Sequence, residues 1–152
     1  MTDRVTNPKI VKELCERYGF RFKKGLGQNF LIDESVVEDT IVGTGITRNT
    51  SVIEIGPGFG SLTQSLLEAA KDVTAIELDS NLIPVLTDLF GSAENFHLIN
   101  ADVLKTDLAA LCREKTEGQH LAPPKVKAAA RVPVAEAVVR QPAVDVTAVF
   151  RP

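Results

Sequence analysis

The segment Ser51–Gly60, which reads SVIEIGPGFG, constrains the fold more than any other part of the chain. Five residues with a strand pattern end in a loop with glycine at every second position, and a helical pattern over residues 61–70 follows at once. Such a loop needs glycines because the turn from strand to helix is tight and because a ligand must approach the bare backbone closely. The segment therefore predicts a strand–loop–helix unit that binds a nucleotide-like ligand.

The central region repeats this alternation of strands and helices. Two more strands are expected at residues 72–78 and 96–100, and further helices at residues 82–90, with Ser80 as the cap, and at residues 104–112. Strands that alternate with helices of this length form βαβ units with right-handed crossovers. We therefore expect an α/β, Rossmann-like fold in which helices flank a parallel sheet.

The first 50 residues precede this alternating region and are expected to form two helices joined by an arm. The first helix begins at Pro8, with Asn7 or Thr6 as its cap, and stops at Gly19. The second is capped by Asp33 and ends near Gly43. Between them, residues 20–30 mix aromatics, lysines and glycines without a clean period, which suits an extended arm.

The composition is that of one globular domain whose charges are segregated. The net charge of −3 is the sum of a basic first part, +4 over residues 1–30, an acidic body, −10 over residues 31–120, and a basic last part. A basic arm ahead of an acidic body suits a polyanionic partner, although a solvated basic helix explains the charge equally well. No apolar run approaches the roughly 20 residues of a membrane span, and no signal pattern is present, so we expect a cytoplasmic monomer without membrane contact.

Two acidic residues are expected at the same edge of the sheet as the glycine loop. Glu77 closes the second strand and Asp102 follows the third, and ligands of such sheets bind outside the carboxyl ends of the strands. Glu77 lies 21 residues after Gly56, a spacing that lets an acid accept both ribose hydroxyls. Asp102 can accept from the exocyclic amine of an adenine, with Ile76, Leu78 and Val103 as apolar neighbours of the ring. For one acid alone a solvated loop residue is the ordinary interpretation, but the three elements in order favour an adenosine site.

The glycine spacing distinguishes between two ligands that contain adenosine. A dinucleotide fingerprint reads Gly-x-Gly-x-x-Gly, whereas here the third glycine comes one residue early and Ser61 occupies its place. A methionine tail presents an amino-acid zwitterion instead of a pyrophosphate, so that a full phosphate cradle is unnecessary. The loop therefore favours S-adenosyl-L-methionine over NAD, and an NAD-dependent oxidoreductase is the less favoured alternative.

Four motifs follow one another with the spacing of a known family: KKGLGQNFLID at 23–33, IEIGPGFGSLT at 53–63, VTAIELD at 73–79 and NADVLKTDL at 100–108. On these motifs the chain resembles the ribosomal RNA adenine dimethyltransferases that modify small-subunit rRNA in bacteria. The resemblance implies a class I methyltransferase fold. It also implies that methyl groups are moved from S-adenosyl-L-methionine to the exocyclic amines of adenines in rRNA, on the pre-ribosomal small subunit.

The resemblance also implies roles for individual residues. It places the methionine part of the cofactor at Gly56, its ribose at Glu77 and its adenine at Asp102, and Phe30 at the entrance. The full set of implied cofactor contacts is Gln28, Asn29, Leu31, Gly56, Gly58, Glu77 and Asp102. Lys23 and Lys24 would face the RNA backbone, where each phosphate contact adds about one unit of salt dependence; a pair of plain solvated lysines is the alternative. His97 and His120 match no family role, and we expect no metal.

The resemblance stops near residue 130. The family carries Asn-Leu-Pro-Tyr after its fourth strand, where it holds the target amine and stacks on the adenine. After the lead-in 125–130, this chain reads Arg131-Val132-Pro133-Val134, in which only the proline coincides. Of the 32 residues from 121 to 152, 21 are Ala, Val or Pro. This composition is typical of a disordered tail, and we favour a frame shift near codon 130 as its origin.

The expected organisation therefore has three parts. Residues 1–50 form the basic helix, the arm and a capping helix, residues 51–130 form a partial core that binds S-adenosyl-L-methionine, and residues 131–152 form a disordered tail outside the family, with the helical C-terminal domain of the family absent. Without the acceptor motif a flipped adenine has no holder, so we expect little or no methyltransferase activity. A non-catalytic module that retains cofactor or RNA binding is the alternative function. A sheet that ends at its fourth strand is also expected to leave an exposed edge.

Overall fold

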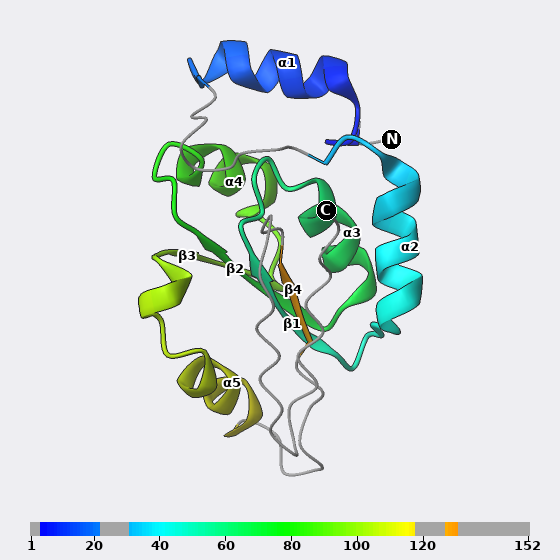
Figure 1. The fold of residues 1–152 in the computed structure, drawn as a ribbon, viewed down its shortest axis with the longest axis vertical. Coiled ribbons are helices and arrows are strands. Elements are labelled where there is room, and N and C mark those ends of the chain that lie inside the picture. The colour runs from blue at the N-terminus through cyan, green and yellow to red at the C-terminus, as the bar shows by residue number, and fades with distance from the viewer. Residues whose placement is uncertain (1–3, 22–30, 118–126, 131–152) are drawn as a thin grey trace.

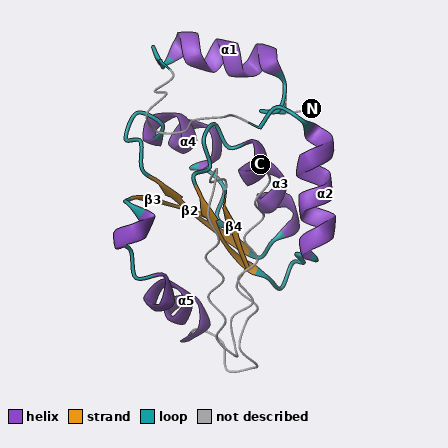
Figure 2. Cartoon of the chain, in the orientation of Figure 1, coloured by secondary structure: helices purple, strands orange, loops and turns teal. Residues whose placement is uncertain are grey.

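The computed structural model describes residues 4–21, 31–117 and 127–130. In these residues four parallel strands form one sheet in the order β3-β2-β1-β4 (Figures 1 and 2). The strands are β1 (Ser51–Ile55), β2 (Asp72–Glu77), β3 (Phe96–Asn100) and β4 (Lys127–Ala130). The expected α/β fold with a parallel sheet is confirmed, and β4 lies at one edge of it.

Five α-helices and one 3-10 turn surround the sheet in the described part of the chain. They are α1 (Pro8–Arg17), α2 (Glu34–Thr44), α3 (Ser61–Ala69), α4 (Ile83–Phe90), the turn Val103–Lys105 and α5 (Leu108–Glu117). Figure 1 shows α2 beside α3 on one side of the sheet and α5 on the opposite side. None of these helices is long and apolar enough to cross a bilayer.

Alternation along the strands divides the core into two layers. On the side of α3, Val52 and Val73 pack with Leu66, whereas Ile53 and Ile76 face the opposite layer formed with α5. Both faces of β1 and β2 are buried, as expected for a parallel sheet that helices cover on both sides. Any polar residue inside these two strands is therefore carried into the core.

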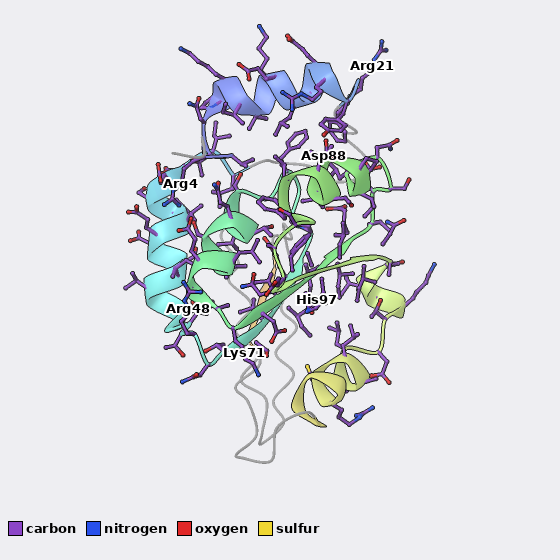
Figure 3. All side chains as sticks on the ribbon, turned by 180° about the vertical axis from the view of Figure 1, so that it is seen from behind. Arg4, Arg21, Arg48, Lys71, Asp88 and His97 are labelled. Atoms are coloured by element: carbon purple, nitrogen blue, oxygen red, sulfur yellow. The ribbon has the colours of Figure 1, made fainter. Side chains whose placement is uncertain are left out.

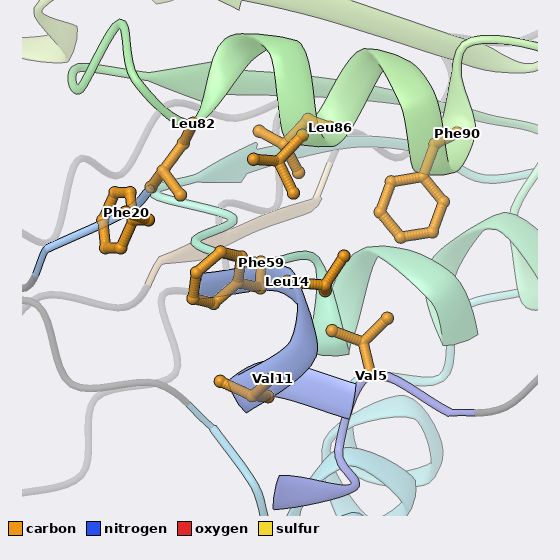
Figure 4. Close-up of a cluster of buried hydrophobic side chains, with 9 residues drawn as sticks. Val5, Val11, Leu14, Phe20, Phe59, Leu82, Leu86 and Phe90 are labelled. Carbon is orange, nitrogen blue, oxygen red and sulfur yellow. The ribbon is translucent and has the colours of Figure 1, made fainter. Parts of the chain in front are cut away.

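A third cluster joins α1 and α4 to the glycine loop (Figure 4). Phe20, just after α1, meets Phe59 of the loop edge to face, with ring centroids 5.2 Å apart. Leu14 of α1 and Leu86 of α4 belong to the same buried cluster. The N-terminal helix is therefore part of the core, and it packs next to the loop that carries the candidate site.

The helix boundaries confirm most of the expected caps. The Asn7 side chain accepts from the Lys9 N–H at 3.0 Å, and the Asp33 side chain accepts from the Ser35 N–H at the same distance. Gly19 adopts a left-handed φ of 59° beyond α1. Helix α2 ends at Thr44, one residue beyond Gly43 and so near the expected position, and Gly45 supplies the left-handed conformation that ends it (φ 60°).

Two other expectations about helices are corrected. Ser80 does not cap α4. The N-cap is Leu82, and the Asp79 side chain instead accepts from Asn81, which closes a turn ahead of the helix. The single helix expected at residues 104–112 is a 3-10 turn followed by α5, because Asp102 caps the turn by accepting from the Leu104 N–H at 3.0 Å.

Candidate cofactor site

The loop between β1 and α3 depends on backbone conformations that favour glycine. Gly56, Gly58 and Gly60 all have positive φ, at 68°, 62° and 87°, and other residues rarely adopt such angles. The Gly56 N–H donates to Ile76 O at 2.9 Å, which fixes the start of the loop to β2. A Cβ on Gly60 would lie 2.2 Å from Phe90 Cε2, so this glycine also lets α4 approach closely. The tight strand-to-helix turn expected from the sequence is confirmed.

Glu77 lies beside this loop at the carboxyl end of β2. Glu77 is only 6% exposed. Its Oε2 accepts from the Gly58 N–H at 3.3 Å, and its Oε1 accepts from the Asp79 N–H at 2.8 Å. Burial raises the pKa of the Glu77 carboxyl, and the hydrogen bonds from these N–H groups partly oppose that rise. The carboxylate is thus a buried acceptor that faces the glycine loop.

Asp102 comes to the same edge of the sheet because β3 pairs with β2. Glu77 is in register with Asn100, whose Nδ2 donates to Glu77 O at 2.7 Å, and Asp102 follows two residues later. The Asp102 side chain is 30% exposed and lies 3.6 Å from Lys105 Nζ. The structure therefore brings together the glycine loop, a buried acid and a partly exposed acid.

Apolar side chains next to these acids differ in their availability to a ligand. Leu78 is 55% exposed and Leu104 is 91% exposed. Ile76, by contrast, is buried with Ile53 in the layer that α5 covers, so the expectation that it borders the ring is wrong. Its side chain points away from Glu77 because successive residues of a strand face opposite sides of the sheet.

Sequence reasoning missed one residue of this region, Glu54. It lies in the middle of β1 on the α3 side and is 2% exposed, and Thr63 Oγ1 donates to its Oε2 at 2.6 Å. Burial raises the pKa of the Glu54 carboxyl to about 7, and the nearby Glu77 carboxyl adds to that rise. The signal was present in the sequence: an acid in the middle of a strand that is apolar on both faces must enter the core.

Several of the expected site residues lie outside the described part of the chain. These are Lys23, Lys24, Gln28, Asn29, Phe30, His120 and Arg131–Val134. Leu31 is described and half-buried, and His97 is exposed on β3. Among the residues that the structure describes, no group of three or more His, Cys, Asp or Glu side chains is placed to hold a metal ion.

Comparison with known proteins identifies the family. Ribosomal RNA adenine dimethylase is the family that matches residues 19–135. "Ribosomal RNA small subunit methyltransferase A" of Alkaliphilus oremlandii is 44% identical over 78% of this chain and 42% of its own length. The protein of the same name from Clostridium botulinum strain Langeland is 54% identical over 68% of this chain and 38% of its own length. The chain thus spans about two fifths of the length of these relatives.

Solved structures with the same arrangement include the 23S rRNA methyltransferase ErmE, with a TM-score of 0.55 and 26% identity over 69% of this chain and 38% of that one. A dimethyladenosine transferase from Plasmodium falciparum has a TM-score of 0.51 and 26% identity over 66% of this chain and 32% of that one. The glycine loop and the two acids therefore lie on a class I methyltransferase fold, and the chain belongs to the ribosomal RNA adenine dimethylase family.

Proposed function

We propose that this chain binds S-adenosyl-L-methionine at the glycine loop and forms the methyl-donor part of an enzyme that dimethylates adenine amines in small-subunit ribosomal RNA. The observation that supports it most is the convergence of the loop, Glu77 and Asp102 at the carboxyl edge of a parallel sheet in a chain of this family. The substrate follows from relatives named as small-subunit rRNA methyltransferases.

The residues present fit the chemistry of the cofactor. An adenosine needs acceptors for two ribose hydroxyls and for the adenine amine, together with apolar surface for the ring. Glu77 and Asp102 are the acceptors, and the exposed Leu78 between β2 and Asp79 is an apolar surface at the same edge. When bound, S-adenosyl-L-methionine would supply an electrophilic methyl group on its sulfonium.

Glu77 would have two tasks in this site. Its 3.3 Å hydrogen bond from the Gly58 N–H is long, so a ribose hydroxyl can replace that partner at small cost, while the 2.8 Å bond from the Asp79 N–H keeps the carboxylate oriented. Gly56 and Gly58 would leave room for the methionine part, because neither carries a Cβ that would stand between ligand and backbone.

The arm would complete the donor site and meet the RNA. Gln28, Asn29 and Leu31 are proposed to border the cofactor, and Lys23 and Lys24 to contact rRNA phosphates. Because rRNA is the proposed substrate, we also infer that the chain acts in the cytoplasm, and we propose that it does so as a monomer.

The residues 131–134 favour a second candidate, a fragment that binds the cofactor or RNA without turnover. Arg131-Val132-Pro133-Val134 stands where the family holds the target adenine, and it offers neither the amide nor the aromatic ring of that motif. Base stacking on an aromatic side chain is typically worth ~1–3 kcal/mol, so its loss alone weakens the hold on an extruded adenine.

Isothermal titration calorimetry with S-adenosyl-L-methionine and with NAD tests the donor site. We expect the first ligand to bind and the second not to. Glu77→Gln and Asp102→Asn should each weaken binding at least tenfold, whereas Glu38→Gln and Asp39→Asn, which change exposed acids of α2, should leave it within twofold. Equal loss in all four variants, or binding of NAD alone, would refute the proposed site.

A further inference from the structure

The Glu54 carboxyl is buried next to the glycine loop, interacts electrostatically with Glu77, and has no role in the function proposed above. It projects from β1 toward α3, two residues before Gly56, where the Thr63 hydroxyl donates to it at 2.6 Å. Thr63 lies in the first turn of α3, the helix that starts at the end of the glycine loop. Glu54 is thus connected to both ends of the segment that would surround the methionine part of the cofactor.

The charged groups that face Glu54 from the described elements are acids. From β2, the Glu77 carboxyl interacts with it electrostatically, and Asp79 lies beyond Glu77 and is itself buried. From α3 it meets the Thr63 hydroxyl, and its neighbour in register on β4 is Ala129. No cationic side chain of the described residues contributes to its ionisation.

A buried acid in such a setting responds strongly to a positive charge brought near it. Burial holds the pKa of Glu54 at about 7, so that at neutral pH the protonated and ionised forms are both populated. A cation bound above the loop would favour the carboxylate, and its removal would restore the proton. The methyl donor carries a sulfonium, and the thioether that remains after methyl transfer is less positive by one charge.

We propose that Glu54 senses the charge of the bound cofactor: it is a carboxylate when the sulfonium occupies the site and takes up a proton from solvent when the thioether product does. This inference depends on the proposed function, because it assumes that the donor binds at the glycine loop. It makes Glu54 a specificity-determining residue, which favours the methyl donor over its product and weakens the product's hold after turnover.

Calorimetry with S-adenosyl-L-methionine and S-adenosyl-L-homocysteine at pH 6 and pH 8 tests the inference. The two ligands share the same amino and carboxyl groups, but the sulfonium also lowers the pKa of the donor's amino group, so the contribution of Glu54 is the difference between the wild-type chain and Glu54→Gln. If the sulfonium lowers the pKa of Glu54 by about one, the ratio should rise up to ~10-fold from pH 6 to pH 8 in the wild-type chain. In Glu54→Gln, which keeps an acceptor for Thr63 but carries no charge, this rise should be absent.

A proton count on the wild-type chain provides a second readout that needs no variant. Titrations at pH 7 in two buffers of different ionisation enthalpy should show that the donor releases more protons on binding than the product does. Equal proton release would overturn the inference, and so would an equal rise of the ratio in Glu54→Gln, because Glu77 or Asp79 would then be its source. Failure of the proposed function is distinct, since in that case neither ligand binds the wild-type chain at either pH.

Discussion

The protonation of the buried Glu54 carboxyl is coupled to the stability of the fold. Its pKa rises from 4.5 in the unfolded chain to about 7 in the fold, with burial as the main cause. Between these values the native state binds a proton that the unfolded state releases, so the free energy of unfolding falls as the pH rises through this window. The change levels off above pH 7, where both states are ionised.

Glu54→Gln should remove this contribution. Relative to the wild type, the variant should gain about 2–3 kcal/mol in free energy of unfolding between pH 5 and pH 8, as measured by urea denaturation at both values. Glu77, whose pKa is also raised by burial, is present in both proteins, so the effect of its own burial cancels, while the repulsion between the two carboxylates counts toward the difference. A difference between the two proteins that does not vary with pH would show that Glu54 is ionised throughout this range.

The lack of a side chain at Gly60 allows both the backbone conformation of the loop and the close packing of α4 against it. Gly60→Ala would force an alanine to a φ of 87° and place its Cβ 2.2 Å from Phe90 Cε2, so we expect a loss of about 2–4 kcal/mol in the free energy of unfolding. Gly43→Ala is the matched control, because Gly43 lies in α2 with open space around it; it should be neutral or gain about 0.5–1 kcal/mol. Equal effects in urea denaturation would contradict the packing argument.

The positions of single residues could be predicted from the sequence where local chemistry determines them. The glycine loop and the positions of Glu77 and Asp102 could be predicted, because the residues lie next to strand ends that the pattern itself marks. The burial of Glu54 follows from its place inside an apolar strand, but the groups that it contacts depend on which face of β1 α3 covers, and Ile76 was misplaced for the same reason. The face that a strand residue takes is set by packing between distant segments.

Among the elements, α1 is the one whose attachment the sequence did not predict. The residues just before it contact α3 and α2: the Val5 N–H donates to Gln64 Oε1 at 3.2 Å, and Arg4 donates to Ser65 Oγ at 3.0 Å and pairs with Glu34 of α2 at 3.1 Å (Figure 3). At its other end Tyr18 hydrogen-bonds to Asp88 of α4. The helix therefore braces α3 and α4 next to the glycine loop.

Phe20→Ala should weaken the packing of α1 against the glycine loop. Removal of a buried ring that contacts Phe59 should cost about 3 kcal/mol in free energy of unfolding, and it should weaken cofactor binding because Phe59 belongs to the loop. Tyr18→Phe, which removes only a solvent-exposed hydrogen bond to Asp88, should cost less than about 1 kcal/mol. Urea denaturation measures the change in free energy of unfolding, and calorimetry measures the change in cofactor affinity. An unchanged cofactor affinity in Phe20→Ala would show that the packing of α1 does not affect the site.

The boundaries of elements were predictable where a side chain or a glycine fixes them. Asn7, Asp33 and Gly19 each act as expected, since caps and left-handed glycines are local features. The start of α4 was not, because the Asp79 side chain forms its turn with Asn81 and leaves the cap to Leu82. Where two polar residues compete for one turn, the sequence alone does not show which one forms the hydrogen bond.

Across the whole molecule, the donor and acceptor functions are expected to separate. The structure describes residues 51–102, which carry the glycine loop, Glu77 and Asp102 of the proposed donor site; the arm residues Gln28 and Asn29 that are proposed to complete it lie outside the described part of the chain. The acceptor function is expected to depend on residues 131–134, which read Arg-Val-Pro-Val and not the Asn-Leu-Pro-Tyr expected from the resemblance. Measurements of cofactor binding and of methyl transfer therefore report on different parts of the chain, and cofactor binding can persist when methyl transfer is lost.

We accordingly expect this chain to bind S-adenosyl-L-methionine but to show little or no methyl transfer. Alignment of the amine with the sulfonium methyl can contribute about 7–11 kcal/mol to a barrier, and residues 131–134 offer neither the amide nor the aromatic ring that we expect to hold the adenine. Transfer of radiolabelled methyl groups to undermodified small-subunit particles measures this, with a relative that carries Asn-Leu-Pro-Tyr as the positive control. Turnover equal to that relative would mean that other residues hold the adenine. Absence of both binding and turnover would instead locate the defect in the donor half.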